Sequence, residues 1–234
     1  MSASSRTSRA GSLPERLRWL DEGSRADHGF LLPSDHCLYF GEFHAGGGWS
    51  AGPTNDLIAD FKRMPSRIAA STQPRAVQYF KDRAIATVAQ VLRRQFGRVA
   101  IETRLTFVPI PASKLPGEAD YCDRLLRTLR LAFSGLEADI RPLLRQRATM
   151  EADHRSGARR IRFGELLELT ELDPIELREP LRPLVVLFDD VLTSGKHVCV
   201  AKARIREVFP EQAIIAVLIA RRAPAPATMQ GPPG

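Results

Sequence analysis

The chain has 234 residues, of which 44% are hydrophobic and 26% are charged, as is typical of a soluble globular protein. No apolar run approaches the roughly 20 residues that a membrane-spanning helix needs, so we expect no membrane partner. The three cysteines, Cys37, Cys122 and Cys199, are odd in number and far apart, which argues against a disulfide framework or a C-x-x-C zinc site and favours a cytoplasmic location. The formal net charge of +7 points to anionic partners.

The N-terminal part predicts a tail and then a small hood on the main domain. Residues 1–12 are rich in Ser and Arg without an apolar core, which predicts a disordered tail. The hood is expected to span residues 13–70. Its expected elements are a short helix through Leu20, a strand from His36 to Phe43, a return strand near Trp49 and a helix from Asp56 to Arg63.

Strand and helix patterns alternate through residues 71–222, which we expect to form the main domain. The expected elements are a helix at 75–96 stopped by Gly97, a strand at 104–110, a helix at 118–133, a strand at 139–144, a helix at 163–169, a strand at 184–188, a helix at 197–208 and a strand at 213–219. Such alternation predicts an α/β fold with a central, mostly parallel sheet flanked by helices. Residues 223–234, rich in Pro, Ala and Gly, predict a second disordered tail.

Residues 184–199 are the most informative stretch. Five apolar residues, Leu184 to Phe188, are typical of a buried parallel strand, and Asp189 and Asp190 follow where such a strand reaches the carboxyl edge of its sheet. Thr193-Ser194-Gly195 then supplies small side chains and a residue free to take a positive φ, so that backbone amides can converge on an anion at the start of the next helix. The stretch therefore predicts a phosphate site beside an acidic pair.

A site that combines carboxylates with a phosphate cradle favours a ligand with hydroxyl groups or a metal ion as well as a phosphate, because carboxylates repel phosphate. A ribose 5-phosphate fits, with its 2- and 3-hydroxyls on Asp189 and Asp190. Neighbouring strand residues point to opposite faces, so both carboxylates serve one sugar only if the chain already turns at Asp190.

Two further segments belong to the expected site. In the loop after the strand at 104–110, Ala112 and Ser113 leave backbone amides accessible, and Lys114 is either a ligand for a second anion or a solvated loop lysine. From Arg141 to Arg162 there are seven arginines against two acids. This basic segment could close over a substrate, contact a nucleic acid or form a solvated surface.

Residues 184–197, Leu-Val-Val-Leu-Phe-Asp-Asp-Val-Leu-Thr-Ser-Gly-Lys-His, resemble the phosphoribosyl pyrophosphate (PRPP) motif of type I phosphoribosyltransferases. The arginine segment resembles that of the ComF-like or amidophosphoribosyltransferase-like branch, here without an N-terminal zinc ribbon. The resemblance covers residues 55–222 and implies the α/β fold of that family. It also implies PRPP or a nucleoside monophosphate as ligand, and Mg²⁺ bound mainly through ligand oxygens and water, with Asp189 and Asp190 as possible water-mediated contacts.

The resemblance also implies roles for individual residues. Catalytic roles fall to Asp189, Asp190, Arg145 and Arg147. The 5-phosphate would be held by Thr193, Ser194, Gly195, Lys196 and His197, and the pyrophosphate by Ala112, Ser113 and Lys114. A flexible loop that closes over PRPP would contain Thr149, Arg155, Arg159 and Arg160. Because Thr193 stands where purine-salvage members carry an acidic general base, a hypoxanthine or guanine acceptor is not expected.

The sequence leaves two functions open. The first is a phosphoribosyltransferase that passes the phosphoribosyl group to an unidentified acceptor and releases pyrophosphate. The second is a non-catalytic nucleotide-sensing or PRPP-sensing module, or a nucleic-acid-associated regulatory module, that keeps the PRPP site. A P-loop is excluded, because Asp190 and His197 stand where its first Gly and its last hydroxyl residue belong. The acceptor and the oligomeric state, with a homodimer as one possibility, are not readable from the sequence.

Overall fold

The structure, a computed structural model, describes residues 11–46, 51–102, 105–150 and 161–224, with the side chains of residues 100–102 left out. Most of the two expected tails, the expected strand near Trp49 and the middle of the arginine segment lie outside these ranges. No helix in the described part of the chain is both long and apolar enough to cross a membrane.

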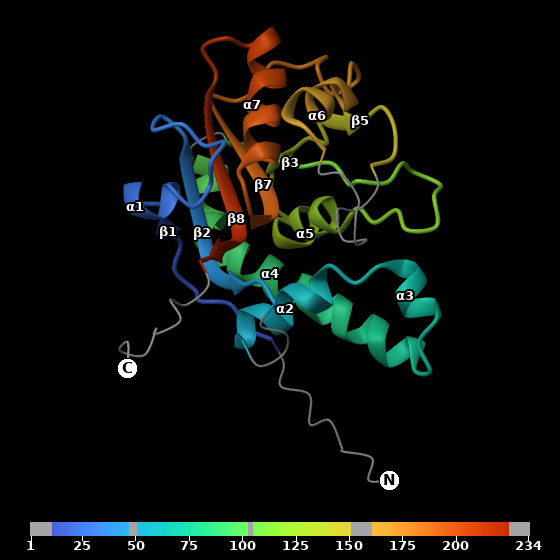
Figure 1. Cartoon of the computed structure of the whole chain (residues 1–234). Coiled ribbons are helices and arrows are strands. Elements are labelled where there is room, and N and C mark those ends of the chain that lie inside the picture. Colours follow the sequence, from blue (N-terminus) through green and yellow to red (C-terminus); the bar gives the residue numbers. More distant parts are fainter. Residues whose placement is uncertain (1–10, 47–50, 103–104, 151–160, 225–234) are drawn as a thin grey trace, which may run out of the picture.

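The described strands form a central six-stranded sheet and a separate two-stranded sheet (Figure 1). The central order is β1 (Arg18–Trp19), β2 (His36–His44), β8 (Ala213–Ala223), β7 (Leu184–Leu192), β3 (Leu105–Pro109) and β4 (Asp139–Ile140). Only the β1–β2 pairing is antiparallel within this sheet, so the expected mostly parallel sheet is confirmed. The small sheet pairs β5 (Leu144–Gln146) with β6 (Thr170–Leu172) in antiparallel fashion.

Helices flank the central sheet. In chain order they are α1 (Glu22–Arg25), α2 (Pro53–Phe61), α3 (Pro65–Ala69), α4 (Pro74–Glu102), α5 (Arg124–Ala132), α6 (Phe163–Leu169) and α7 (Lys196–Val208). Helix α4 packs against α5 and α2, whereas α7 packs against α6 and β6 (Figure 1). The expected helix at 163–169 is confirmed without change, and the expected helix at 197–208 begins one residue earlier.

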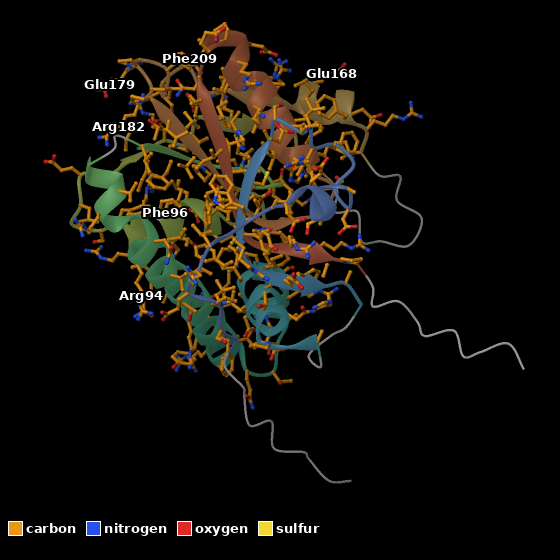
Figure 2. All side chains as sticks on the ribbon, turned by 90° about the vertical axis from the view of Figure 1, so that its left-hand side faces the viewer. Arg94, Phe96, Glu168, Glu179, Arg182 and Phe209 are labelled. Carbon is orange, nitrogen blue, oxygen red and sulfur yellow. The ribbon has the colours of Figure 1, made fainter. Side chains whose placement is uncertain are left out.

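The long helix α4 shows how the core is closed. Phe96 is buried and meets the ring of Phe107 on β3 at 5.8 Å, whereas Arg94 on the same helix is half-exposed and points away from the sheet (Figure 2). The prediction that Gly97 stops this helix is wrong. The helix continues to Glu102, because contacts with α5 outweigh the helix penalty of about 1 kcal/mol for a glycine.

Two other expected helices are also wrong in part. No helix forms from Ser12 to Leu20; instead Leu20 donates its amide to the carbonyl of Cys37, which continues the pairing of β1 with β2. The helix expected at 118–133 begins only at Arg124. Gly117 has φ of +93°, and the residues after it form turns, so helical backbone is interrupted there.

The strand expected at 139–144 divides into two. β4 joins the central sheet beside β3, whereas β5 belongs to the small sheet. Pro142 lies between them and has no amide hydrogen to donate, so one continuous ladder cannot form.

Residues 13–70, expected to form a hood, contribute directly to the central sheet. β2 pairs in parallel with β8 along eight registered positions, and Leu13, Leu20 and Phe40 belong to the same hydrophobic cluster as Val186. One continuous core therefore includes residues from Leu13 to Ala220.

Candidate functional site

Asp189 and Asp190 lie in the last part of β7, beyond the point where β3 stops. The last β3 pairing joins Pro109 to Phe188, and the amide of Ile110 then donates to the carbonyl of Phe188. From Asp189 onward the β3 side of β7 has no neighbouring strand in the described chain, so both carboxylates border this open end. The strand continues to Leu192, and the turn at Asp190 on which joint ribose binding was conditional is absent.

Because successive strand residues point to opposite faces, the two carboxylates meet different helices. Asp190 is 4% exposed and receives two cations from one face: Lys62 Nζ lies 2.9 Å from Oδ1, and Arg124 Nη2 lies 2.5 Å from Oδ2. Burial by itself raises the pKa of a carboxyl group, but the charges of Lys62 and Arg124 outweigh it and hold the pKa of Asp190 well below its ordinary value.

Asp189 faces the opposite helix, α7. Its Oδ1 accepts a hydrogen bond of 2.7 Å from the amide of Asp190, and its Oδ2 lies 3.7 Å from Nδ1 of His197. Burial by itself lowers the pKa of an imidazole, but the negative charges of Asp189 and Asp190 outweigh it and raise the pKa of His197. A cationic imidazole is thereby favoured at the N-terminus of α7, beside a carboxylate.

The loop between β7 and α7 has the backbone that the sequence predicts. Gly195 is the N-cap of α7 with φ of +81° and ψ of −1°, the left-handed conformation that favours glycine. Because α7 begins at Lys196, its first amides have no acceptor within the helix and are suited to an anion.

A segment near the N-terminus is hydrogen-bonded to this loop, and the sequence alone did not predict the contact. We call residues 28–35 the strap. The ring Nδ1 of His28 donates to the carbonyl of Thr193, and the amide of Phe30 donates to the carbonyl of Ser194 at 3.0 Å. In a planar trans peptide the N–H points away from the preceding C=O, so these bonds turn the amides of Ser194 and Gly195 away from the strap.

The strap is itself anchored to α7. Asp35 is 3% exposed and pairs with Lys202, which is also buried, and the Cys199 thiol donates to the carbonyl of Phe30 at 2.9 Å. The side chain of Lys196 is also occupied, because it donates to the carbonyl of Ile161 and lies 5.3 Å from the centroid of the Phe30 ring. Lys196 therefore offers the loop its backbone amide, whereas its ammonium group is engaged elsewhere.

The expected pyrophosphate loop lies against the base of the arginine segment. The carbonyl of Ser113 accepts a hydrogen bond of 2.8 Å from the amide of Met150, and Thr149 Oγ1 accepts one of 3.3 Å from the amide of Leu115. Thr149 in turn donates to Glu118. Ala112, Ser113 and Lys114 are half-buried, and these hydrogen bonds bring the loop next to Thr149.

Three arginines at the start of the basic segment are engaged in ion pairs. Nε of Arg145 and Nε of Arg147 each lie 2.6 Å from a different carboxylate oxygen of Glu171 on the facing strand β6. Arg141 is 8% exposed and binds Asp139 at 2.8 Å. These three side chains therefore form no free basic surface, and Arg155, Arg159 and Arg160 lie outside the described residues.

The polar residue of β5 that faces α7 is Gln146. The alternation of β5 places Arg145 on one face and Gln146 on the other, where Gln146 lines a small hollow together with His197. The hollow is otherwise mostly apolar and is lined by Ile110, Pro111, Leu144 and Leu166, among others. Oε1 of Gln146 is buried with no hydrogen-bond partner in the described part of the chain, so it can still accept a hydrogen bond from a ligand or water.

The carboxylates of Asp189 and Asp190 already have partners, and this limits how they could bind a divalent cation. No group of three or more acidic, His or Cys side chains that could hold a metal ion occurs among the described residues. Both oxygens of Asp190 face cationic groups, which leaves Asp189 as the carboxylate with capacity for a bound water. This arrangement fits Mg²⁺ held chiefly by ligand oxygens and water rather than by a protein cage.

No protein-family model matches the chain, and no curated protein matches it significantly. The assignment to a family therefore stays a prediction from residues 184–197, and the geometry of the site carries the functional argument.

Proposed function

We propose that this protein is phosphoribosyltransferase-like: it binds PRPP with Mg²⁺ and transfers the phosphoribosyl group to an acceptor, with release of pyrophosphate. The observation that carries the proposal is the continuous run from Asp189 to His197. It joins two buried carboxylates at an open strand end to a left-handed glycine at the start of a helix. The proposal includes the type I phosphoribosyltransferase fold, with which the mostly parallel sheet is compatible.

In this proposal the 5-phosphate is bound by backbone amides of Ser194, Gly195, Lys196 and His197, aided by the imidazole of His197 and the dipole of α7. Thr193 and Ser194 add hydroxyl groups. Because the carboxylates of Asp189 and Asp190 point to opposite faces of β7, both accept hydrogen bonds from the ribose hydroxyls only if the end of this strand turns when the sugar binds. These groups fix the sugar and leave its anomeric carbon pointing toward the loop at Ala112 to Lys114.

In this proposal the pyrophosphate binds at that loop, through the amides of Ala112 and Ser113 and the ammonium group of Lys114, three residues that are half-buried. As the bond from the anomeric carbon to the pyrophosphate oxygen breaks, negative charge grows on the leaving group and positive charge on the sugar. Arg145 and Arg147 stabilise the leaving group only if they release Glu171 and bind the pyrophosphate instead. Mg²⁺ would be held chiefly by ligand oxygens and water, with Asp189 as the carboxylate free to contact such a water, and would supply further charge neutralisation.

Pyrophosphate release from PRPP in the presence of a pool of amines, nucleobases and other small nucleophiles tests this proposal. We expect release that depends on Mg²⁺ and on Asp189, and that rises with one class of acceptor. Absence of release with every acceptor, despite tight PRPP binding, contradicts transfer.

A specific observation favours the second candidate, a PRPP-sensing or nucleotide-sensing module. The two proposed catalytic arginines share the single carboxylate of Glu171, and Asp190 pairs with both Lys62 and Arg124. A binding protein needs no further rearrangement of the arginines. Binding of PRPP without turnover, together with a salt-sensitive change in nucleic-acid binding when PRPP is added, supports this candidate.

A further inference from the structure

The two cations on Asp190 are held in different ways. Arg124 comes from α5, its side chain is only 19% exposed, and its guanidinium lies 5.8 Å from the centroid of the Phe61 ring. Lys62 directly follows the last residue of α2, and its side chain is 42% exposed. An exposed lysine pair is weak and easily exchanged, whereas a buried arginine pair is costly to separate.

One buried residue, Lys81, binds the segments that carry both cations. Nζ of Lys81, which is 4% exposed, donates to the carbonyl of Arg63 at 2.5 Å and to the sulfur of Cys122 at 3.0 Å. Arg63 is the neighbour of Lys62, and Cys122 precedes Arg124 by two positions. Exchange at Asp190 is therefore a movement of the Lys62 side chain and not of the segments that carry the cations.

Asp190 already accepts three hydrogen bonds, and two of them are on Oδ1. Oδ1 accepts from Lys62 and, at 2.7 Å, from the amide of Val191, while Oδ2 accepts from Arg124. A sugar hydroxyl that is to bind Oδ1 must displace the ammonium group of Lys62. The displaced ammonium group then stays beside the open end of β7, where a pyrophosphate would lie.

We propose that Lys62 is an exchangeable counter-ion of the site: it occupies Asp190 in the free protein, leaves it when a ribose hydroxyl binds, and then pairs with the diphosphate of PRPP. Arg124 stays on Asp190 in both states and keeps its charge compensated. This inference rests on the proposed function. It makes the site selective for PRPP over ribose 5-phosphate, because only the diphosphate of PRPP gains a contact with Lys62.

The proposal predicts effects of opposite sign for two ligands in the variant Lys62→Met. Ribose 5-phosphate no longer competes with an ammonium group, and we expect it to bind about threefold tighter. Pyrophosphate with Mg²⁺ loses a charged contact, and we expect it to bind about tenfold more weakly. Isothermal titration calorimetry at constant salt measures both affinities.

Arg63→Met is the matched control, because it removes one positive charge at the adjacent position, where Arg63 pairs with Asp60 at 2.7 Å and not with Asp190. We expect it to change either affinity by less than about twofold. Lys62→Arg is a second test that keeps the charge. A guanidinium holds a carboxylate more firmly than an ammonium group does, so this variant should bind ribose 5-phosphate more weakly than the wild type.

The outcomes separate this inference from the proposed function. If the wild-type protein binds neither ligand, the proposed function fails, and the role of Lys62 fails with it. If the wild type binds both, but Lys62→Met weakens both alike or changes neither, the exchange is contradicted while the proposed function stands.

Discussion

The guanidinium of Arg124 and the carboxylate of Asp190 lie 2.5 Å apart, although 66 residues separate them in the chain. Both side chains are largely buried, so this pair compensates a charge that water does not reach. Arg124→Met leaves the buried carboxylate with Lys62 alone, and we expect the free energy of unfolding to fall by about 3 kcal/mol. Denaturant unfolding measures the loss.

Arg127→Met on the same helix provides the control, since Arg127 and its partner Asp82 are half-exposed. Its expected effect is below about 1 kcal/mol. The double variant Arg124→Met with Asp190→Asn should recover much of the lost stability, because no buried charge is then left uncompensated. Equal losses for Arg124→Met and Arg127→Met contradict a special role for the buried pair.

The raised pKa of His197 predicts that phosphate affinity depends on pH. Burial opposes the cation and Lys62 opposes it further, but Asp189 and Asp190 outweigh both, so the ring keeps its proton above its ordinary range. Between about pH 7 and pH 9 the phosphate of ribose 5-phosphate is a dianion throughout. Affinity should therefore fall as pH rises through the His197 pKa, and His197→Gln should flatten the profile. An unchanged profile in His197→Gln excludes His197 as the titrating group.

The same raised pKa has a consequence for stability. Because the folded state binds the His197 proton more tightly than the unfolded state, this contribution is fully present below the unfolded pKa of about 6.5 and is lost as pH rises through the folded pKa.

The pKa of His28 in the strap is shifted in the opposite direction, below its ordinary value. Its Nδ1 donates to Thr193, while its Nε2 is buried with no partner in the described chain, and burial lowers its pKa. Asp27 favours the charged ring and Arg221 disfavours it. The stability that the neutral ring provides is complete above about pH 6.5 and is lost as pH falls toward the folded pKa. His28→Gln keeps a donor and should remove part of the loss of unfolding free energy between pH 7 and pH 5. If the wild type and this variant lose stability in parallel, His28 is not the group responsible.

Gly195→Ala tests the turn that forms the proposed phosphate cradle. An added Cβ lies 2.6 Å from Cγ of Leu31 in the strap, and φ of +81° is unfavourable for alanine. We expect a loss of about 1–3 kcal/mol in unfolding free energy and a loss of ribose 5-phosphate binding. Two glycine variants separate the causes: Gly117→Ala has the φ penalty without a contact, and Gly164→Ala in α6 has neither. An effect of Gly195→Ala no larger than that of Gly117→Ala contradicts the tight strap contact, because only the φ penalty then remains.

The sequence predicts the buried start of β7, the turn at Gly195 and α7, because an apolar run and a glycine determine local structure within sixteen residues, but it does not predict that β7 continues to Leu192. It does not predict Lys62 and Arg124 as partners of Asp190, since these contacts bridge 128 and 66 residues and depend on how α2 and α5 pack. The strap is missed for the same reason: its contacts with Thr193 and Ser194 are made by one ring nitrogen and one backbone amide.

Arg145 and Arg147 show a different limit of pattern reading. The family resemblance implied that both arginines act on a ligand, and the alternation of β5, continued one residue beyond its end at Gln146, places them on one face. Glu171 on the neighbouring strand β6 lies opposite Arg145 and pairs with both arginines. The spacing of residues in the sequence does not predict this strand register. Gln146, between the two arginines, lines the hollow beside His197 instead.

Calorimetric titration of the full-length protein with PRPP, with and without Mg²⁺, tests the central claim most directly. The account predicts saturable binding that strengthens with Mg²⁺ and weakens at least about tenfold in Asp189→Asn, since that carboxylate would lose its charge-assisted hydrogen bond to the sugar. Absence of binding by PRPP, ribose 5-phosphate and nucleoside monophosphates alike, with a folded wild-type protein, contradicts it.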